Sequence, residues 1–165
     1  MMQINNPRDL FVHELQLIYD TEHKIRELLQ EASGKANDKD LAQMLRNQAK
    51  ETAQEINKLD QCFAELGEQP QRMPCAGIDG IMQDYQTIAK QHPSPDVYDM
   101  AVVSTGMKID HYEIGVYRDL VDRAVLMDQS RVAQILQSIL YEEEESASRL
   151  ERASHEMSQR TLAAV

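Results

Sequence analysis

The sequence predicts an all-α protein, a four-helix bundle, and three observations carry this prediction. The chain is rich in Leu, Ile, Met, Ala, Glu, Gln and Lys, with no tryptophan and only 2 phenylalanines, a composition that favours helices over strands. Apolar residues recur every three or four positions along four long segments, which is the spacing of one helix face. Most of the 6 glycines and 5 prolines fall in short patches between these segments, where helices should end.

Length, net charge and cysteine content limit which classes of protein this chain can belong to. With 165 residues the chain can bury a substantial core, and we expect residues 1–165 to form a single domain. The net charge of -11 argues against binding of nucleic acid or an anionic membrane, since both need a basic face. No uncharged apolar stretch is long enough to cross a bilayer, and the N-terminal segment lacks a signal-peptide pattern. We therefore expect a cytoplasmic protein, with Cys62 and Cys75 as reduced thiols.

Capping and breaking residues mark the expected helix ends. Asn6 followed by Pro7 is a favourable helix start, and Gly34 should end the first helix. Gly67 should end the second, and the two prolines of HPSP at 92–95 should end the short one. The helices are expected at about Pro7–Ser33, Asn37 or Asp38 to Leu66, Ile78–Lys90 (the short one), Asp96–Val125 and Ser130–Arg160, and the last residues, 161–165, are expected to fray.

The connection between the second and third long helices is unusually long. It contains a loop at 68–80 with two prolines and two glycines, followed by the short helix. Two helices joined in this way need not be antiparallel neighbours. A single long crossover is a feature of ferritin-like bundles. The predicted fold is therefore a ferritin-like four-helix bundle whose crossover connection carries a short extra helix.

Each long helix carries an acid where its apolar stripe should be buried. A buried carboxylate is unfavourable unless a positive charge meets it. The acids also fall within about two residues of the expected helix midpoints, so parallel packing would bring them to one level of the bundle. In the third long helix the stripe reads Met100, Val103, Met107, Asp110, Ile114, Tyr117, Val121; Glu113 adjoins it, and the corresponding acids of the other helices are Glu22, Glu51 with Glu55, and Glu143.

This arrangement of acids predicts a metal site. Four to six carboxylates at one level cannot all remain ionised, so either several are protonated or a multivalent cation lies among them. Di-iron and di-manganese bundles follow the second solution, and all-oxygen ligands suit hard cations such as iron or manganese. Any one of the acids taken alone could equally be ion-paired at a helix edge; their presence on all four helices favours the metal. The candidate ligands are Glu22, Glu51, Glu55, Asp110, Glu113 and Glu143.

Three further residues lie near the acids. Tyr19 and Tyr117 are candidates to hydrogen-bond a ligand carboxylate. His111 points about 100° away from Asp110 around the helix, so a packing or supporting role is favoured over metal ligation.

Four stretches resemble the YciE/YciF family, ferritin-like stress proteins of bacteria: FVHELQLIYDTEHKI at 11–25, KETAQEINKLDQ at 50–61, KIDHYEIGVY at 108–117 and LYEEEESASRL at 140–150. The loop MPCAGIDGIM at 73–82 also resembles the family's cysteine-containing connection. The resemblance covers nearly the whole chain and implies a four-helix bundle with a di-metal site, drawn as a homodimer. It implies that the family acids correspond to Glu22, Glu51, Glu113 and Glu143, with Asp110 where relatives often have Glu.

Two functions remain open because the sequence departs from the usual di-iron pattern. The Glu-x-x-His pairs of di-iron bundles are absent. The residue three positions after Glu51 is Gln54, and the residue three positions after Glu143 is Ser146. One function is a stress-response protein with an iron or manganese di-metal centre and ferroxidase or peroxide-consuming activity. The other is a non-catalytic dimeric structural or interaction protein with a degenerate metal site.

Overall fold

The structure, a computed structural model, describes residues 4–164 and consists of helices and their connections. The helices are α1 (Pro7–Lys35), α2 (Lys39–Leu66), α3 (Ala76–Ala89), α4 (Pro95–Leu126) and α5 (Ser130–Ala163). The described residues form no strand, which confirms the all-α prediction. A search of these helices finds no segment with the length and apolar character needed to span a membrane.

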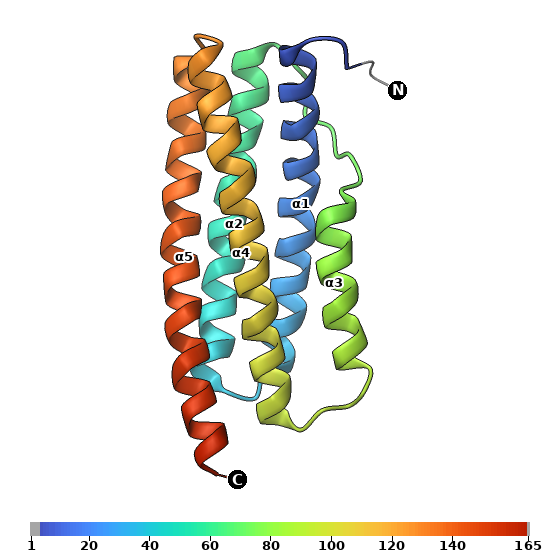
Figure 1. The fold of residues 1–165 in the computed structure, drawn as a ribbon, viewed down its shortest axis with the longest axis vertical. Coiled ribbons are helices and arrows are strands. Elements are labelled where there is room, and N and C mark those ends of the chain that lie inside the picture. The colour runs from blue at the N-terminus through green and yellow to red at the C-terminus, as the bar shows by residue number, and fades with distance from the viewer. Residues whose placement is uncertain (1–3, 165) are drawn as a thin grey trace.

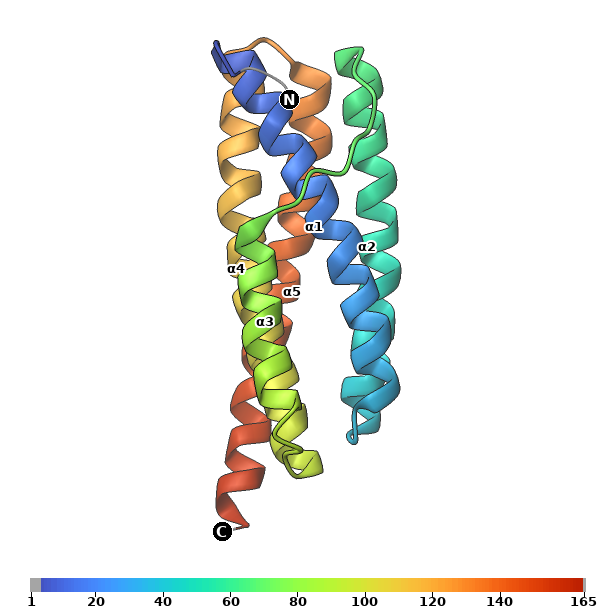
Figure 2. The ribbon, with the colours of Figure 1, turned by 90° about the vertical axis from the view of Figure 1, so that its right-hand side faces the viewer.

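The four long helices stand side by side, and α3 lies against the outside of the bundle (Figures 1 and 2). Helix α1 packs against α2 and α4, and α5 packs against the same two helices. In Figure 1, α2 and α4 both run upward while α1 and α5 run downward. Helices α2 and α4 can be parallel because the connection between them crosses α1 and returns as α3 (Figure 2). This is the predicted crossover bundle.

Contacts with α1 fix the crossover connection in place. The backbone N–H of Met73 donates to the carbonyl of Gln16 at 3.4 Å. Arg72 lies 2.9 Å from the buried carboxylate of Asp20, which Lys24 also approaches at 2.7 Å. The crossover is thereby held against the outer face of α1, leaving the inner faces of the long helices to pack on one another.

The helix ends follow the capping residues closely. The Asn6 side chain accepts a hydrogen bond from the backbone of Asp9 at the start of α1. Asp38, one of the two expected caps, accepts from two backbone N–H groups of the first turn of α2. Gly67 ends α2 with a left-handed φ of 70°, a conformation that glycine adopts without a Cβ clash.

Three expected helix ends are wrong by two or three residues. Helix α1 runs through Gly34, and α3 begins at Ala76, before its expected start at Ile78. Helix α5 continues to Ala163, so most of the segment expected to fray is helical; residue 165 lies outside the described part. No glycine or proline follows Arg160, so nothing local stops the last helix.

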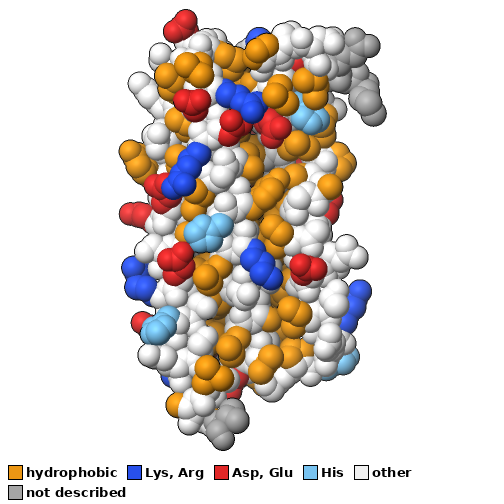
Figure 3. All heavy atoms as spheres, viewed as in Figure 1, with side chains coloured by type: hydrophobic (Ala, Val, Ile, Leu, Met, Phe, Trp, Pro, Cys, Tyr) orange, Lys and Arg blue, Asp and Glu red, His pale blue; other side chains and the backbone are white. Residues whose placement is uncertain are grey.

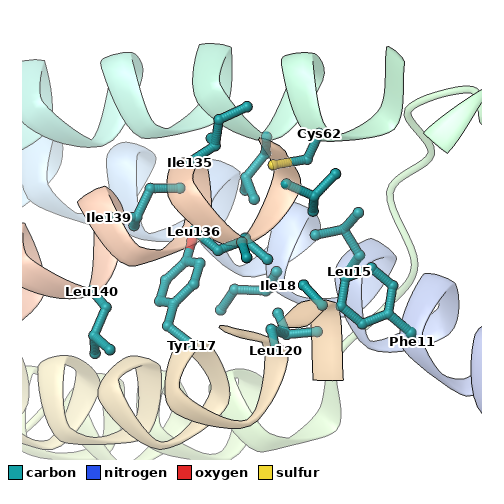
Figure 4. Packing of buried hydrophobic residues seen from close by; sticks show 14 of the residues in the cluster. Phe11, Leu15, Ile18, Cys62, Tyr117, Leu120, Ile135, Leu136, Ile139 and Leu140 are labelled. Carbon is teal, nitrogen blue, oxygen red and sulfur yellow. The ribbon is translucent and has the colours of Figure 1, made fainter. Parts of the chain in front are cut away.

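Two apolar clusters fill the bundle, one on each side of the acid level. The first includes Phe11, Leu15, Ile18, Leu59, Tyr117 and Leu136 (Figure 4). The second includes Ile25, Leu29, Leu45, Val103 and Leu150, together with Ile78 and Tyr85 from α3. Five buried acids form a polar layer between the two apolar clusters: Glu22, Glu55, Asp110, Glu113 and Glu143.

Both cysteines are free thiols, and they lie in different surroundings. Cys62 lies in the first apolar cluster, where burial raises the pKa of its thiol to about 12. Cys75 precedes α3, and its sulfur lies 3.0 Å from the hydroxyl of Tyr112. The expectation of free thiols is confirmed for this structure.

The surface mixes acidic, basic and apolar side chains, as Figure 3 shows for one face. Several of the acids are paired with cations on neighbouring helices, for example Glu144 with Arg118 at 2.8 Å. Such exposed pairs contribute little to stability, about 0–1 kcal/mol each. The acids of the polar layer differ from these surface residues because they are buried.

Candidate metal centre

One glutamate from each long helix points into the polar layer. Glu22 on α1, Glu55 on α2, Glu113 on α4 and Glu143 on α5 are 0, 2, 2 and 5% exposed. Each is at helical spacing from the apolar residues of its own helix, so burial of the stripe carries the carboxylate inward. On α1, for example, Ile18 belongs to the first apolar cluster and Ile25 to the second.

The carboxylates converge from different helices. One oxygen from each of Glu22, Glu113 and Glu143 lies within 4.8 Å of the others. Glu55 lies close enough to Glu143, and Glu22 close enough to Glu113, for each carboxyl group to perturb the pKa of its neighbour. We call these four side chains the glutamate cluster. Carboxyl groups buried this close together cannot all remain ionised, so the metal-free cluster is partly protonated.

Burial and mutual repulsion raise the carboxyl pKa values. Burial is the main cause for Glu22, whose pKa rises to about 7, and for Glu55, whose pKa rises to about 9. Burial and the neighbouring acids raise the pKa values of Glu113 and Glu143 well above the ordinary value. A cation among these oxygens would replace the protons and stabilise the ionised forms.

Tyr117 supports the cluster from α4. Its hydroxyl donates a hydrogen bond to Oε1 of Glu22, and both side chains are fully buried. Burial and the nearby glutamates raise the pKa of Tyr117 well above its ordinary value, so it remains a donor. The prediction that Tyr117 hydrogen-bonds a cluster carboxylate is confirmed.

The remaining oxygens fit a cation better than they fit one another. Within the described residues, no hydrogen-bond partner reaches Oε2 of Glu22 or Oε1 of Glu113, although both atoms are buried. Unpaired buried oxygens are unfavourable and rare in folded proteins. Three convergent carboxylates with Glu55 beside them are a suitable ligand set for a hard cation such as iron or manganese. The side chains present therefore fit the metal that the sequence predicts.

Asp110 is buried close to the cluster but not within its triad of converging oxygens. It lies one helical turn before Glu113 on α4 and is 4% exposed. Burial raises its pKa to about 7, while a hydrogen bond from Ser146 on α5 lowers it. Asp110 is thus placed to act beside the glutamate cluster, one turn along the bundle.

The side chain of Glu51 points toward solvent and not inward as the sequence predicts. Its carboxylate is 43% exposed and lies 2.9 Å from Arg149 on α5. Thr52 and Glu55 occupy the buried face of α2 in its place. The structure therefore brings together Glu22, Glu55, Glu113 and Glu143, with Asp110 adjacent, and leaves Glu51 at the surface between α2 and α5.

Two other candidates do not reach the cluster. The hydroxyl of Tyr19 donates to Asp60 at 2.9 Å, on the outer side of α1 and α2, so its expected bond to a cluster carboxylate is wrong. His111 is exposed and its ring lies 3.1 Å from Glu151. Both face away because neighbouring residues of the same helices occupy the buried stripe.

A cavity of about 40 Å³ adjoins the cluster. A water molecule needs about 10–15 Å³ of such space, so the cavity is large enough for a few waters or for small ions. Glu55, Glu113 and Glu143 line the cavity with polar atoms. Side chains of the second apolar cluster form its apolar lining. The cavity therefore extends from the glutamates toward the α1–α2 loop end of the bundle.

Two residues lining this cavity were not selected as site residues from the sequence. Gln48 on α2 and Ser146 on α5 are 8 and 5% exposed, and the Gln48 amide donates to the Ser146 hydroxyl. Both lie on the helical stripe of their segments, which was the available signal. Polar residues on a stripe are common enough that spacing alone does not distinguish them.

Two ion pairs flank the cavity where α2 meets α5. Glu51 and Glu142 line its outer part. Glu51 is paired with Arg149, and Glu142 lies 2.6 Å from Lys58. Glu51 and Glu142 are therefore cavity-lining side chains that also reach solvent.

Comparison with known proteins gives the family. The sequence matches the family described as Domain of unknown function (DUF892) over residues 6–163. It is 25% identical to protein YciF of Escherichia coli K12 over 143 residues, which are 86% of each protein.

Two solved structures share the fold. YcfI from Rhodopseudomonas palustris, described as a candidate structural protein, is 31% identical, with a TM-score of 0.87 over 90% of this chain and 95% of that one. The E. coli stress protein YciF, whose crystal structure is known, is 22% identical in sequence. The two structures have a TM-score of 0.89, and the match covers 94% of this chain and 99% of YciF. The resemblance to YciF is confirmed, and the chain belongs to the DUF892 family.

Proposed function

We propose that this member of the DUF892 family is a stress-response protein that binds iron or manganese in a di-metal centre at its polar layer, with ferroxidase or peroxide-consuming activity. The observation that carries the proposal is the convergence of Glu22, Glu113 and Glu143, which each place one carboxylate oxygen within 4.8 Å of the others in the buried polar layer. Ferritin-like di-metal proteins build their sites from carboxylates in this way.

The protein's own residues have distinct parts in such a centre. Glu22, Glu55, Glu113 and Glu143 would hold the metal, and Tyr117 orients Glu22 by its hydrogen bond. Bound iron or manganese would supply electrons to an oxidant such as oxygen or peroxide. The protons now shared among the glutamates must leave when the metal binds, so binding is coupled to proton release. The two apolar clusters limit access of bulk water to the layer.

Replacing two converging glutamates tests the metal site. The double variant Glu113→Gln with Glu143→Gln keeps side-chain size but removes two charges. We expect it to lose manganese or iron binding, measured by elemental analysis after reconstitution, while far-UV circular dichroism stays unchanged. The matched control is Glu144→Gln with Glu145→Gln on the outer face of α5, which should bind as the parent does. Unaltered metal content in the Glu113/Glu143 variant would refute the assignment.

Activity is tested separately on the parent protein. Adding ferrous iron to metal-free protein should cause oxygen or peroxide consumption above the rate of iron in buffer. The Glu113/Glu143 variant should return the rate to that of buffer. A metal-loaded parent without any consumption of oxygen or peroxide would exclude the redox part of the proposal while leaving metal binding in place.

The second candidate function is structural, and the missing histidines favour it. Lys58 and Ser146 stand three residues after Glu55 and Glu143, where di-iron bundles carry histidine. The relative from R. palustris is itself described as a candidate structural protein. In this alternative the parent protein would bind no metal at a defined stoichiometry and would act through contacts with partners. Elemental analysis of protein purified from cells separates the two functions.

A homodimer in the cytoplasm completes the proposal. Two cysteines that make no disulfide framework support the expected compartment, and the resemblance to the YciE/YciF family supports the dimer. Sedimentation equilibrium should return twice the chain mass of 18.9 kDa. A mass of a single chain, or of a large cage, would contradict the dimer.

A further inference from the structure

The cavity beside the glutamate cluster is closed on most of its sides. Among the described residues that line it, all are buried except Glu51, Gly106 and Glu142. Leu150 fills the space beside Gly106, since its Cδ1 lies 2.8 Å from the position that a Cβ would take. The other two residues are carboxylates on α2 and α5, which are 43 and 38% exposed. The cavity therefore meets solvent where α2 lies against α5.

Two crossed ion pairs bridge α2 and α5 at this contact. Glu51 on α2 lies 2.9 Å from Arg149 on α5, and Lys58 on α2 lies 2.6 Å from Glu142 on α5. We call these four side chains the α2–α5 seam. The two pairs are seven residues apart on each helix, which is about 10.5 Å along the axis. A glutamate of the cluster lies between them on each helix, so the seam spans the level of the cluster.

A buried amide lies where the cavity meets a groove on the outside of the seam. The groove shares Gln48 and Glu51 with the cavity and is also lined by Arg149. Gln48 is 8% exposed, and within the described residues its Oε1 has no hydrogen-bond partner. A buried acceptor without a donor is unfavourable, and a passing cation or its bound water would satisfy it. Gln48 thus places an unpaired oxygen between the groove and the cavity.

The charges along the groove and the cavity attract cations, with one exception. Acids line both spaces, from Asp40 at the surface through Glu51 to the glutamate cluster. Among the described residues that line either space, Arg149 is the only base. Its guanidinium opposes the approach of a cation, but its pair with Glu51 is partly exposed. Such pairs contribute about 0–1 kcal/mol, so Arg149 can leave Glu51 at little cost.

We propose that divalent cations reach the glutamate cluster through the α2–α5 seam and that the Glu51–Arg149 ion pair is its gate. The proposal rests on the proposed function, since it assumes that the cluster holds metal. Glu51 accepts the cation when Arg149 turns away toward solvent. Oε1 of Gln48 is then the next oxygen on the way to Glu55. Glu51 and Arg149 control the rate of loading and are not ligands in the loaded protein.

A gate has a kinetic signature that a metal ligand lacks. Opening the gate speeds both entry and release, whereas the amount of metal bound at saturation does not change. Mn²⁺ is the probe, because the electron paramagnetic resonance signal of the free ion falls when the ion binds. Rapid mixing with metal-free protein at low ionic strength gives the loading rate. Excess chelator added to loaded protein gives the release rate.

Charge reversal on each side of the gate tests the route. Arg149→Glu should load Mn²⁺ roughly 10-fold faster than the parent, and Glu51→Arg should load it slower by a similar factor. The matched controls are Arg118→Glu and Glu144→Arg, which make the same charge changes in an ion pair of 2.8 Å between α4 and α5. Neither control residue lines the cavity or the groove, so both variants should load at the parental rate.

Three other outcomes would overturn the gate. Loading rates in the Glu51 and Arg149 variants equal to those of their controls would exclude the route while leaving the cluster assignment intact. Loss of bound Mn²⁺ at saturation in Glu51→Arg, with circular dichroism unchanged, would make Glu51 a ligand and not a gate. A parent that binds no Mn²⁺ would overturn the proposed function and this inference together.

Discussion

Tyr117 on α4 donates a hydrogen bond across the bundle to Oε1 of Glu22 on α1. The two residues are separated by 95 positions in the chain, and both side chains are fully buried. The tyrosine ring belongs to the first apolar cluster (Figure 4), while its hydroxyl reaches Glu22 in the polar layer. Tyr117 therefore connects the apolar packing of the bundle to the position of a candidate metal ligand.

Tyr117→Phe should weaken the site without disrupting the core. The ring is retained, but Oε1 of Glu22 loses its donor, and leaving a buried acceptor unpaired costs about 1–3 kcal/mol. Loss of a group that orients a metal ligand lowers affinity by roughly 10–100-fold. Mn²⁺ titration and urea unfolding measure the two effects. Tyr141→Phe is the control, since Tyr141 is 62% exposed on α5 and should alter neither quantity. Parental Mn²⁺ affinity in Tyr117→Phe would contradict the role of this bond.

Metal-free protein should become less stable as pH rises from about 5 to 9. The pKa values of Glu22 and Glu55 are raised from 4.5 to about 7 and about 9, so the folded state holds protons that the unfolded state has released. Their stabilising contribution is complete below the ordinary pKa and is lost as pH rises through the raised values, at about 1.4 kcal/mol per pKa unit.

Urea unfolding in the presence of a chelator, at a series of pH values, measures this dependence. Asp20 and Asp38 have lowered pKa values and act in the opposite direction, but only in the acid range near and below their ordinary value of 3.8. His23 and Cys75, whose pKa values are lowered from 6.5 and 9.0, also oppose the trend, but they are two groups against five buried carboxyls with raised pKa values. A free energy of unfolding that is constant or increases between pH 5 and 9 would contradict the protonated state of the cluster.

Glu143→Gln should stabilise the metal-free protein at pH 8 and destabilise the metal-loaded one. The amide keeps the shape and a hydrogen-bond donor but needs no proton to stay neutral, so the repulsion that raises the pKa of Glu143 is removed. With metal present, the variant loses a ligand charge and the stabilisation that binding supplies. Thermal unfolding with chelator and with Mn²⁺ gives the two midpoints. Shifts of the same sign in both conditions would be inconsistent with a metal role for Glu143.

Arg149→Ala should change the rate of metal entry more than it changes stability. Arg149 is partly exposed and pairs with Glu51 where the cavity approaches solvent, and such pairs contribute about 0–1 kcal/mol. Removing its positive charge should speed the approach of Mn²⁺, measured by stopped flow at low ionic strength. Arg152→Ala, one turn later and exposed, is the control. Equal rates in the two variants would exclude this seam as the entry route.

The buried acids on the apolar stripes could be recognised from sequence because each interrupts an otherwise regular helical period. Glu22 and Glu143 are the only acids on their stripes, so their inward direction followed from spacing alone. On α2 the period allowed two choices, since Glu51 and Thr52 are three and four residues after Gln48. Packing turned Thr52 and Glu55 inward and left Glu51 to pair with Arg149, 98 residues further along the chain.

The sequence by itself determined the helices, their ends to within a few residues, and the level at which acids lie, because caps, breakers and apolar spacing are local properties. Tertiary structure decided which oxygens converge, which remain without a donor, and where the cavity lies. Those features depend on the rotation of each helix about its own axis. That rotation is set by side chains packing between helices that are distant in sequence, which no local pattern records.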